Sequence, residues 1–136
     1  MPEAQADAGA AGKARVLIVE DDYLAASDAE FSLRQAGYEV VGIARSADDA
    51  IRLASAERPR VIVMDIRLSG QRDGIEAAIE LFRATGIRCI FATAHDDAWM
   101  RLRARPANPL GWLPKPYTSR DLIETVRSAV ETLRQR

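Results

Sequence analysis

The sequence predicts an α/β fold in which five helices cover a doubly wound parallel sheet of five strands. Short runs of apolar, mostly β-branched residues alternate with longer segments of helical period, which is the pattern of repeated strand and helix units. The runs are almost continuous in hydrophobicity, as parallel strands covered on both faces are. The length of 136 residues suits one compact domain, expected at residues 14–136 after a disordered tail at residues 1–13.

The strand and helix limits follow from the apolar runs, the capping residues and the prolines. The strands are predicted at residues 16–19, 40–43, 61–64, 89–92 and 111–113. Leu24, Phe31 and Leu33 mark a first helix that is expected to end at Gly37. The other helices are expected from Ser46 to before Pro59, from near Gly74 to Gly86, from about Asp96 to Ala104, and from Thr118 or Ser119 to the C-terminus. Because Pro106 and Pro109 prevent an ordinary continuation, the fourth helix is expected to be short and mobile.

Composition and charge argue against several classes of protein. Hydrophobic residues make up 48% and charged residues 29% of the chain, and its net charge is −1, so no general attraction to nucleic acid or to an anionic membrane is expected. The one cysteine, Cys89, cannot form an internal disulfide. Because the N-terminus does not resemble a signal peptide and no apolar stretch is long enough to span a bilayer, we expect the protein to be cytoplasmic.

Polar side chains stand at the ends of four predicted strands. Glu20 and Asp21 follow the first strand, Asp65 follows the third, Thr93 the fourth and Lys115 the fifth. Because right-handed crossovers bring the carboxyl ends of parallel strands to one edge, we expect these side chains to converge. Converging carboxylates repel one another unless a cation neutralises them, and an oxygen-only set suits Mg²⁺, with Mn²⁺ also possible. A carboxylate beside such an ion can accept a phosphoryl group.

The segments VLIVEDD, VIVMDIRL, FATA and GWLPKPY resemble the four signature blocks of the response regulator receiver family, and the resemblance covers residues 15 to about 133. It implies a flavodoxin-like receiver fold with strand order 2-1-3-4-5. It also implies that Asp65 takes the phosphoryl group. Mg²⁺ would be bound directly by Asp21, through water by Glu20, and by the backbone carbonyl of Arg67.

The same resemblance implies roles for the residues around the phosphoacceptor. Thr93 would donate its hydroxyl to one phosphoryl oxygen and Lys115 would pair with another. The Lys115–Pro116 peptide bond is expected to be cis. Trp112 stands three residues before the lysine, where the family usually has Tyr or Phe, and would be the aromatic switch residue.

Some features depart from the family pattern. The loop at residues 67–74 is one residue longer than in the chemotaxis receiver and lacks its proline. The run at residues 91–93 resembles a receiver subgroup linked to general stress signalling, but Ala94 and His95 follow it instead of Gly and an aromatic residue. Arg67 and His95 occupy positions that influence dephosphorylation in the family, so we expect an unusual rate of hydrolysis.

The resemblance implies a phosphoacceptor switch of a bacterial two-component or phosphorelay system, and not an enzyme with separate substrate turnover. The phosphoryl donor would be a sensor histidine kinase or a histidine phosphotransfer protein. Phosphorylation would change how the face formed by the fourth helix, fifth strand and fifth helix binds a downstream protein. We expect no direct binding to nucleic acid or membrane, and either a monomer or a weak phosphorylation-dependent dimer. Arg101, Arg103 and Arg105 form a basic cluster on the fourth helix, more typical of a solvated face than of a binding patch.

Other functions fit the residues less well. A pseudo-receiver, which binds partners without being phosphorylated, is the alternative, because the long loop and Trp112 are unusual. An aspartyl-phosphate phosphatase of the haloacid type would need a second acid two residues after Asp65, where Arg67 stands. A flavodoxin-like redox protein would need a phosphate-binding loop where Glu20 and Asp21 would repel phosphate.

Overall fold

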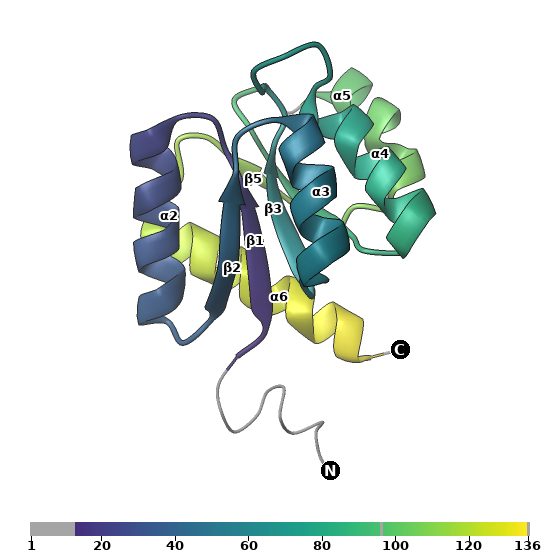
Figure 1. Cartoon of the computed structure of the whole chain (residues 1–136). Helices are drawn as coiled ribbons and strands as arrows, with labels where there is room; N and C mark the ends of the chain where they lie inside the picture. The colour runs from purple at the N-terminus through teal and green to yellow at the C-terminus, as the bar shows by residue number, and fades with distance from the viewer. Residues whose placement is uncertain (1–12, 96, 136) are drawn as a thin grey trace.

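The computed structural model describes residues 13–95 and 97–135 and has the predicted α/β fold (Figure 1). The sheet contains β1 (Arg15–Val19), β2 (Glu39–Ala44), β3 (Val61–Asp65), β4 (Cys89–Thr93) and β5 (Gly111–Pro114). All neighbouring strands are parallel, and their order is β2-β1-β3-β4-β5. The predicted strands and their order are therefore confirmed.

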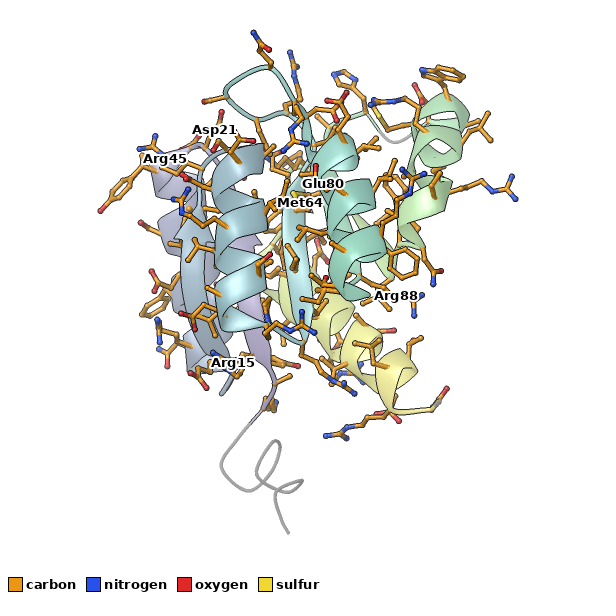
Figure 2. The ribbon with its side chains drawn as sticks, turned by 45° about the vertical axis from the view of Figure 1, so that its right-hand side comes forward. Arg15, Asp21, Arg45, Met64, Glu80 and Arg88 are labelled. Atoms are coloured by element: carbon orange, nitrogen blue, oxygen red, sulfur yellow. The ribbon has the colours of Figure 1, made fainter. Side chains whose placement is uncertain are left out.

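Helices cover both faces of the sheet and bury a separate core on each. The elements are α2 (Tyr23–Gln35), α3 (Ala47–Glu57), α4 (Gly74–Thr85), α5 (Ala98–Ala104), the 3₁₀ turn η1 (Arg105–Ala107) and α6 (Ser119–Arg134). Val16 and Ile18 pack with α2 and α6 on one face, whereas Leu17 and Met64 pack with α3 and α4 on the other. Figure 2 shows Met64 between α3 and α4. Alternate residues of each strand therefore point to opposite faces of the sheet and pack into separate cores, which explains the unbroken apolar runs.

Capping residues begin the helices where the sequence predicts. Ser46, Asp73 and Thr118 each accept a hydrogen bond from the backbone N–H three residues further on, at the starts of α3, α4 and α6. Asp22 caps α2 in the same way, through the N–H groups of Leu24 and Ala25. The first turn of each of these helices is therefore specified locally.

The first helix buries a different face from the one that its large apolar residues suggest. Leu33 is buried, but Leu24 and Phe31 are 72% and 65% exposed. Ala26 and Ala29 pack beside Leu33 instead. Residues 26, 29 and 33 share one helical face, and residues 24 and 31 share another, so the two sets cannot both face the sheet.

Two further predictions concern the ends of segments. The fourth helix is short, as expected, but begins at Ala98 with Asp97 as its N-cap, and η1 follows at Pro106. Asp96 and most of the predicted tail, residues 1–12, lie outside the described residues. Lys13, the last residue of the predicted tail, donates its backbone N–H to the carbonyl of Gly37 at 3.2 Å. Within the described ranges, no helix is long and apolar enough to cross a membrane.

Gly74 allows α4 to begin directly against the end of β3. Its N–H donates to the carbonyl of Ile66 at 2.8 Å. A Cβ atom at this position would lie 2.1 Å from the backbone oxygen of Asp65, so any side chain would push α4 and the end of β3 apart. The glycine therefore helps to position the strand end that carries Asp65.

We predict that Gly74→Ala lowers the free energy of unfolding by about 1–3 kcal/mol, the usual cost of overpacking. The matched control is Gly42→Ala in β2, because a Cβ there would meet Leu53 at an ordinary 3.7 Å. Equilibrium unfolding in urea measures both variants. Equal stability of the two variants would contradict the prediction.

Candidate functional site

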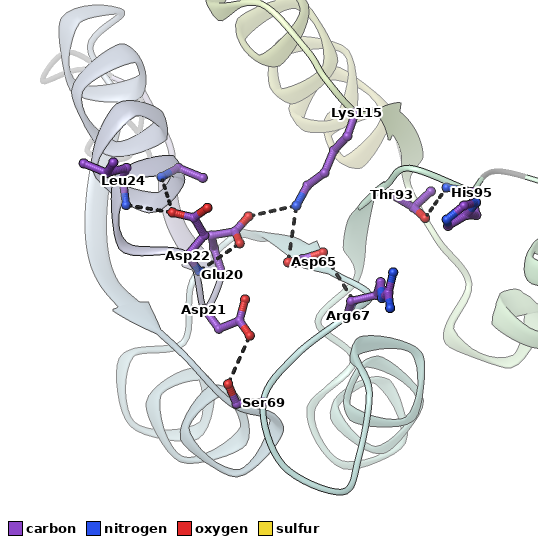
Figure 3. A network of polar contacts seen from close by, with 11 residues as sticks. Glu20, Asp21, Asp22, Leu24, Asp65, Arg67, Ser69, Thr93, His95 and Lys115 are labelled. Atoms are coloured by element: carbon purple, nitrogen blue, oxygen red, sulfur yellow. Dashed lines mark hydrogen bonds and ion pairs between the residues drawn. The ribbon is translucent and has the colours of Figure 1, made fainter.

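Three carboxylates meet at the carboxyl edge of the sheet (Figure 3). Glu20 and Asp21 follow β1, and Asp65 is the last residue of β3. One oxygen from each residue lies within 4.8 Å of the other two. Glu20 and Asp65 are buried, whereas Asp21 is half-buried. The predicted convergence is therefore present for the three carboxylates.

Lys115 lies between the two buried carboxylates. Its Nζ atom is 3.1 Å from Glu20 Oε1 and 3.3 Å from Asp65 Oδ2. The Lys115–Pro116 peptide bond is cis, as predicted. One ammonium among three carboxylates leaves two negative charges if all are ionised, which a divalent cation would balance.

Backbone N–H groups hold the remaining oxygens of the two buried carboxylates. Glu20 Oε2 accepts a hydrogen bond from the N–H of Asp22 at 3.1 Å, and Asp65 Oδ1 accepts one from the N–H of Arg67 at 3.3 Å. Each buried carboxylate is thus held by Lys115 at one oxygen and by the main chain at the other. This fixes the orientation of both groups.

Burial and charge shift the ionisation of this cluster. Burial is the main reason that the pKa of Asp65 stands at about 6, above its ordinary value of 3.8. The negative charge of Glu20 also raises the pKa of Asp65, and the ammonium of Lys115 lowers it. Burial alone would lower the pKa of Lys115, but the neighbouring carboxylates of Asp65 and Glu20 outweigh this effect and raise it.

The donor set fits a hard divalent cation. Mg²⁺ binds oxygen ligands at about 2.1 Å, which places ligand oxygens roughly 3–4 Å apart, so small adjustments would bring these three carboxylates around one ion. The set contains no sulfur or imidazole ligand, which disfavours Zn²⁺ or copper. Glu20, Asp21 and Asp65 are therefore the residues that could hold a metal.

The other predicted site residues lie along β4 and β5. Thr93 is buried, and its hydroxyl oxygen accepts the N–H of His95 at 3.0 Å, whereas the His95 side chain is exposed. Trp112 is half-buried, and its ring centroid lies 5.1 Å from that of Phe91. The guanidinium of Arg101 lies 4.8 Å from the Trp112 ring centroid, which is a cation–π contact.

Sequence reasoning missed Ser69 as a member of this site. Its hydroxyl donates to Asp21 Oδ2 at 3.0 Å, and its backbone forms an isolated parallel bridge with Ser46. The only signal in the sequence was the unusual length of the loop, which does not indicate where the extra residue goes. The side chain of Arg67 is exposed, and its backbone N–H donates to Asp65 Oδ1.

Comparison with known proteins identifies similar chains. Residues 16–127 match the family described as the response regulator receiver domain. The transcriptional regulatory protein PdtaR of Mycobacterium tuberculosis (strain CDC 1551 / Oshkosh) is 37% identical over 129 residues, which are 95% of this chain and 62% of PdtaR. The phyllosphere-induced regulator PhyR of Methylorubrum extorquens (strain AM1) is 29% identical over 116 residues, which are 85% of this chain and 43% of PhyR.

A similar solved structure is the crystal structure of a signal receiver domain of a modulated diguanylate cyclase from Desulfovibrio desulfuricans G20. It has a TM-score of 0.81 and 34% identity, and the match covers 90% of this chain and 97% of that one. The chain thus spans less than two thirds of these curated relatives.

The raised pKa of Asp65 predicts how stability depends on pH without metal. Because the folded chain holds the proton of Asp65 more tightly than the unfolded chain, protonation of Asp65 stabilises the folded state. This contribution to the free energy of unfolding is complete below about pH 4 and is lost as the pH rises through about 6. Between pH 4 and pH 7, the free energy of unfolding of the wild type is expected to fall by roughly 2–3 kcal/mol relative to that of Asp65→Asn. Urea unfolding in EDTA measures this difference.

Saturating MgCl₂ provides the control, since an ion that binds the ionised wild-type site stabilises it and reduces the difference at pH 7. Parallel pH curves for the two proteins in EDTA would show that Asp65 does not carry the shift.

Proposed function

Because the chain belongs to the response regulator receiver family, we propose that it is a phosphoacceptor switch in which Asp65 accepts a phosphoryl group with the help of Mg²⁺. The observation that supports this most directly is the geometry at Asp65. Its carboxylate is buried, oriented by Lys115 and the N–H of Arg67, and close to two further acids. This is the arrangement needed for a carboxylate nucleophile whose product carries a dense negative charge.

The proposed reaction transfers a phosphoryl group from a phosphohistidine of a sensor kinase or a histidine phosphotransfer protein. An oxygen of Asp65 attacks the phosphorus, the bond from phosphorus to the imidazole nitrogen breaks, and its electron pair returns to the imidazole. Asp21, Asp65 and the backbone carbonyl of Arg67, with Glu20 through water, would hold Mg²⁺ or Mn²⁺, which would neutralise charge at the phosphoryl oxygens. We propose no turnover of a separate substrate.

Thr93 and Lys115 would hold the phosphoryl group after the transfer. Thr93 accepts a hydrogen bond from His95, so its own hydroxyl hydrogen is available to donate to a phosphoryl oxygen. Lys115 is already within 3.3 Å of Asp65 and would pair with another oxygen. The exposed side chains of Arg67 and His95 follow β3 and β4, and we propose that they influence the rate of hydrolysis.

The output surface would be the face formed by α5, β5 and α6. Trp99 and Leu102 of α5 are 66% and 52% exposed, which is unusual for large apolar side chains and suits a protein partner. The basic cluster on this segment is not simply solvated, because Arg101 lies over Trp112 and Arg103 forms a salt bridge with Asp73 at 3.0 Å. These two contacts connect the proposed output surface to the switch residue and to the start of α4.

The partners that this proposal requires are proteins, and the proposed location is the cytoplasm. One is the phosphohistidine donor and the other is a downstream protein that distinguishes the two forms of the chain. The proposed chain is a monomer or a weak dimer that forms on phosphorylation. PdtaR is named as a transcriptional regulator, but this chain matches only 62% of its length, so transcriptional output is not carried over.

Phosphorylation can be tested with acetyl phosphate and Mg²⁺, followed by intact mass measurement. We expect the wild type to gain the mass of one phosphoryl group, and Asp65→Asn and Asp21→Asn to lose more than about 90% of the labelling, because the nucleophile or a metal ligand is removed. Asp22→Asn is the matched control, since asparagine keeps the cap of α2 while removing a neighbouring carboxylate.

No mass gain in the wild type, under conditions that label a known receiver, would reject the proposal. That result would favour the pseudo-receiver, which binds partners without phosphorylation.

The role of Trp112 can be tested by fluorescence in a Trp99→Phe background, where Trp112 is the remaining tryptophan. Arg101→Met removes the cation from the ring. Because a cation–π contact is worth about 0.5–1 kcal/mol, this should raise the ratio of the phosphorylated to the unphosphorylated conformation about 2–5-fold. The emission before and after acetyl phosphate measures the shift. Arg105→Met is the control, and equal responses of the two variants would contradict a specific role for Arg101.

A further inference from the structure

We propose that Ser69 is a positioning residue for the metal site, whose hydroxyl holds the carboxylate of Asp21 in the orientation that binds Mg²⁺. Ser69 is not itself a ligand in this proposal. The inference rests on the proposed function, because Mg²⁺ binding is part of that function. It assigns a role to the unusual loop at residues 67–74.

Asp21 differs from the two buried carboxylates in how it is held. Lys115 and a backbone N–H fix both oxygens of Glu20 and of Asp65. Within the described part of the chain, the carboxylate of Asp21 receives one hydrogen bond, from the Ser69 hydroxyl at 3.0 Å. The orientation of this half-buried group therefore depends on Ser69.

The hydrogen bond leaves the metal-facing side of Asp21 open. Ser69 donates to Oδ2, and in Figure 3 the other oxygen of Asp21 lies on the side of Glu20 and Asp65. A second contact holds the main chain at this point, because Arg45 donates to the backbone carbonyl of Asp21 at 3.0 Å. The residue is thus fixed at its backbone by Arg45 and at its side chain by Ser69.

Ser69 is itself held in place by contacts that do not involve the carboxylate cluster. Its backbone pairs with Ser46 at the start of α3. Three residues further along the loop, Arg72 donates to Asp48 at 2.9 Å and also pairs with Glu80 of α4. These contacts attach the loop to two helices, so the hydroxyl is in position before a metal binds.

A preoriented ligand binds a metal more tightly than a free one. The terminal torsion of an aspartate is soft, so without a partner the Asp21 carboxylate would sample many orientations. Groups that orient a ligand commonly change metal affinity by 10–100-fold. Because Asp21 is one of several ligands and Mg²⁺ keeps much of its water, we expect an effect near the lower limit, about 10-fold.

Isothermal titration of the metal-free chain with MgCl₂ tests the proposal. Ser69→Ala should weaken Mg²⁺ binding about 10-fold, and Ser69→Thr, which keeps the hydroxyl, should restore binding to within about 2-fold of the wild type. The matched control is Gln71→Ala, an exposed position in the same loop, which should leave the affinity unchanged. The melting temperature in EDTA should be equal for all four proteins, since the loss is expected in metal binding rather than in folding.

Three results would overturn the inference, and they are distinguishable. If the wild type does not bind Mg²⁺, the metal site of the proposed function fails and this inference fails with it. If the wild type binds Mg²⁺ and Ser69→Ala binds it equally well, Ser69 does not position Asp21. If Ser69→Ala binds more tightly, the hydroxyl competes with the metal instead of preparing its ligand.

Discussion

The sharing of one ammonium by two buried carboxylates is the interaction on which the site depends. Lys115 is 95 residues from Glu20 in the chain, yet its Nζ atom lies 3.1 Å from Glu20 and 3.3 Å from Asp65. Two unpaired carboxylates at this depth would repel each other and take up protons. Lys115 therefore makes it possible for acids from β1 and β3 to face one another at the end of a close-packed sheet.

Short chains of contacts connect Asp65 and the neighbouring strands to distant parts of the fold. Asp65 accepts the N–H of Arg67, and the loop beyond leads to Asp73, which caps α4 and pairs with Arg103 of α5. On the neighbouring strands, Phe91 of β4 packs against Trp112, and Arg101 of α5 covers that ring. One chain of contacts thus runs from the carboxyl edge to Arg103, and a second set joins the middle of β4 to Arg101. The proposed phosphorylation of Asp65 would add charge at the start of the first of these chains of contacts.

Most of the fold and the centre of the site could be predicted from local patterns. The apolar runs specified the strands, and the residues at positions 46, 73 and 118 specified helix starts through bonds that span only three residues. The rule that parallel strands end at one edge was enough to bring Glu20, Asp65 and Lys115 together. The first helix shows what such patterns leave open: α2 forms where Leu24, Phe31 and Leu33 predict it, but it packs on the sheet through Ala26, Ala29 and Leu33 and leaves Leu24 and Phe31 exposed.

The sequence by itself determined which chemical groups meet, since strand-end positions depend on residue order and on the handedness of the crossovers. Only the tertiary structure decided how those groups are oriented and what surrounds them. Ser69 reaches Asp21 across 48 residues, and Arg101 reaches Trp112 from another element. Both contacts depend on the path of a loop or the placement of a short helix. Such paths result from many weak contacts made only in the folded chain, so no local pattern of residues encodes them.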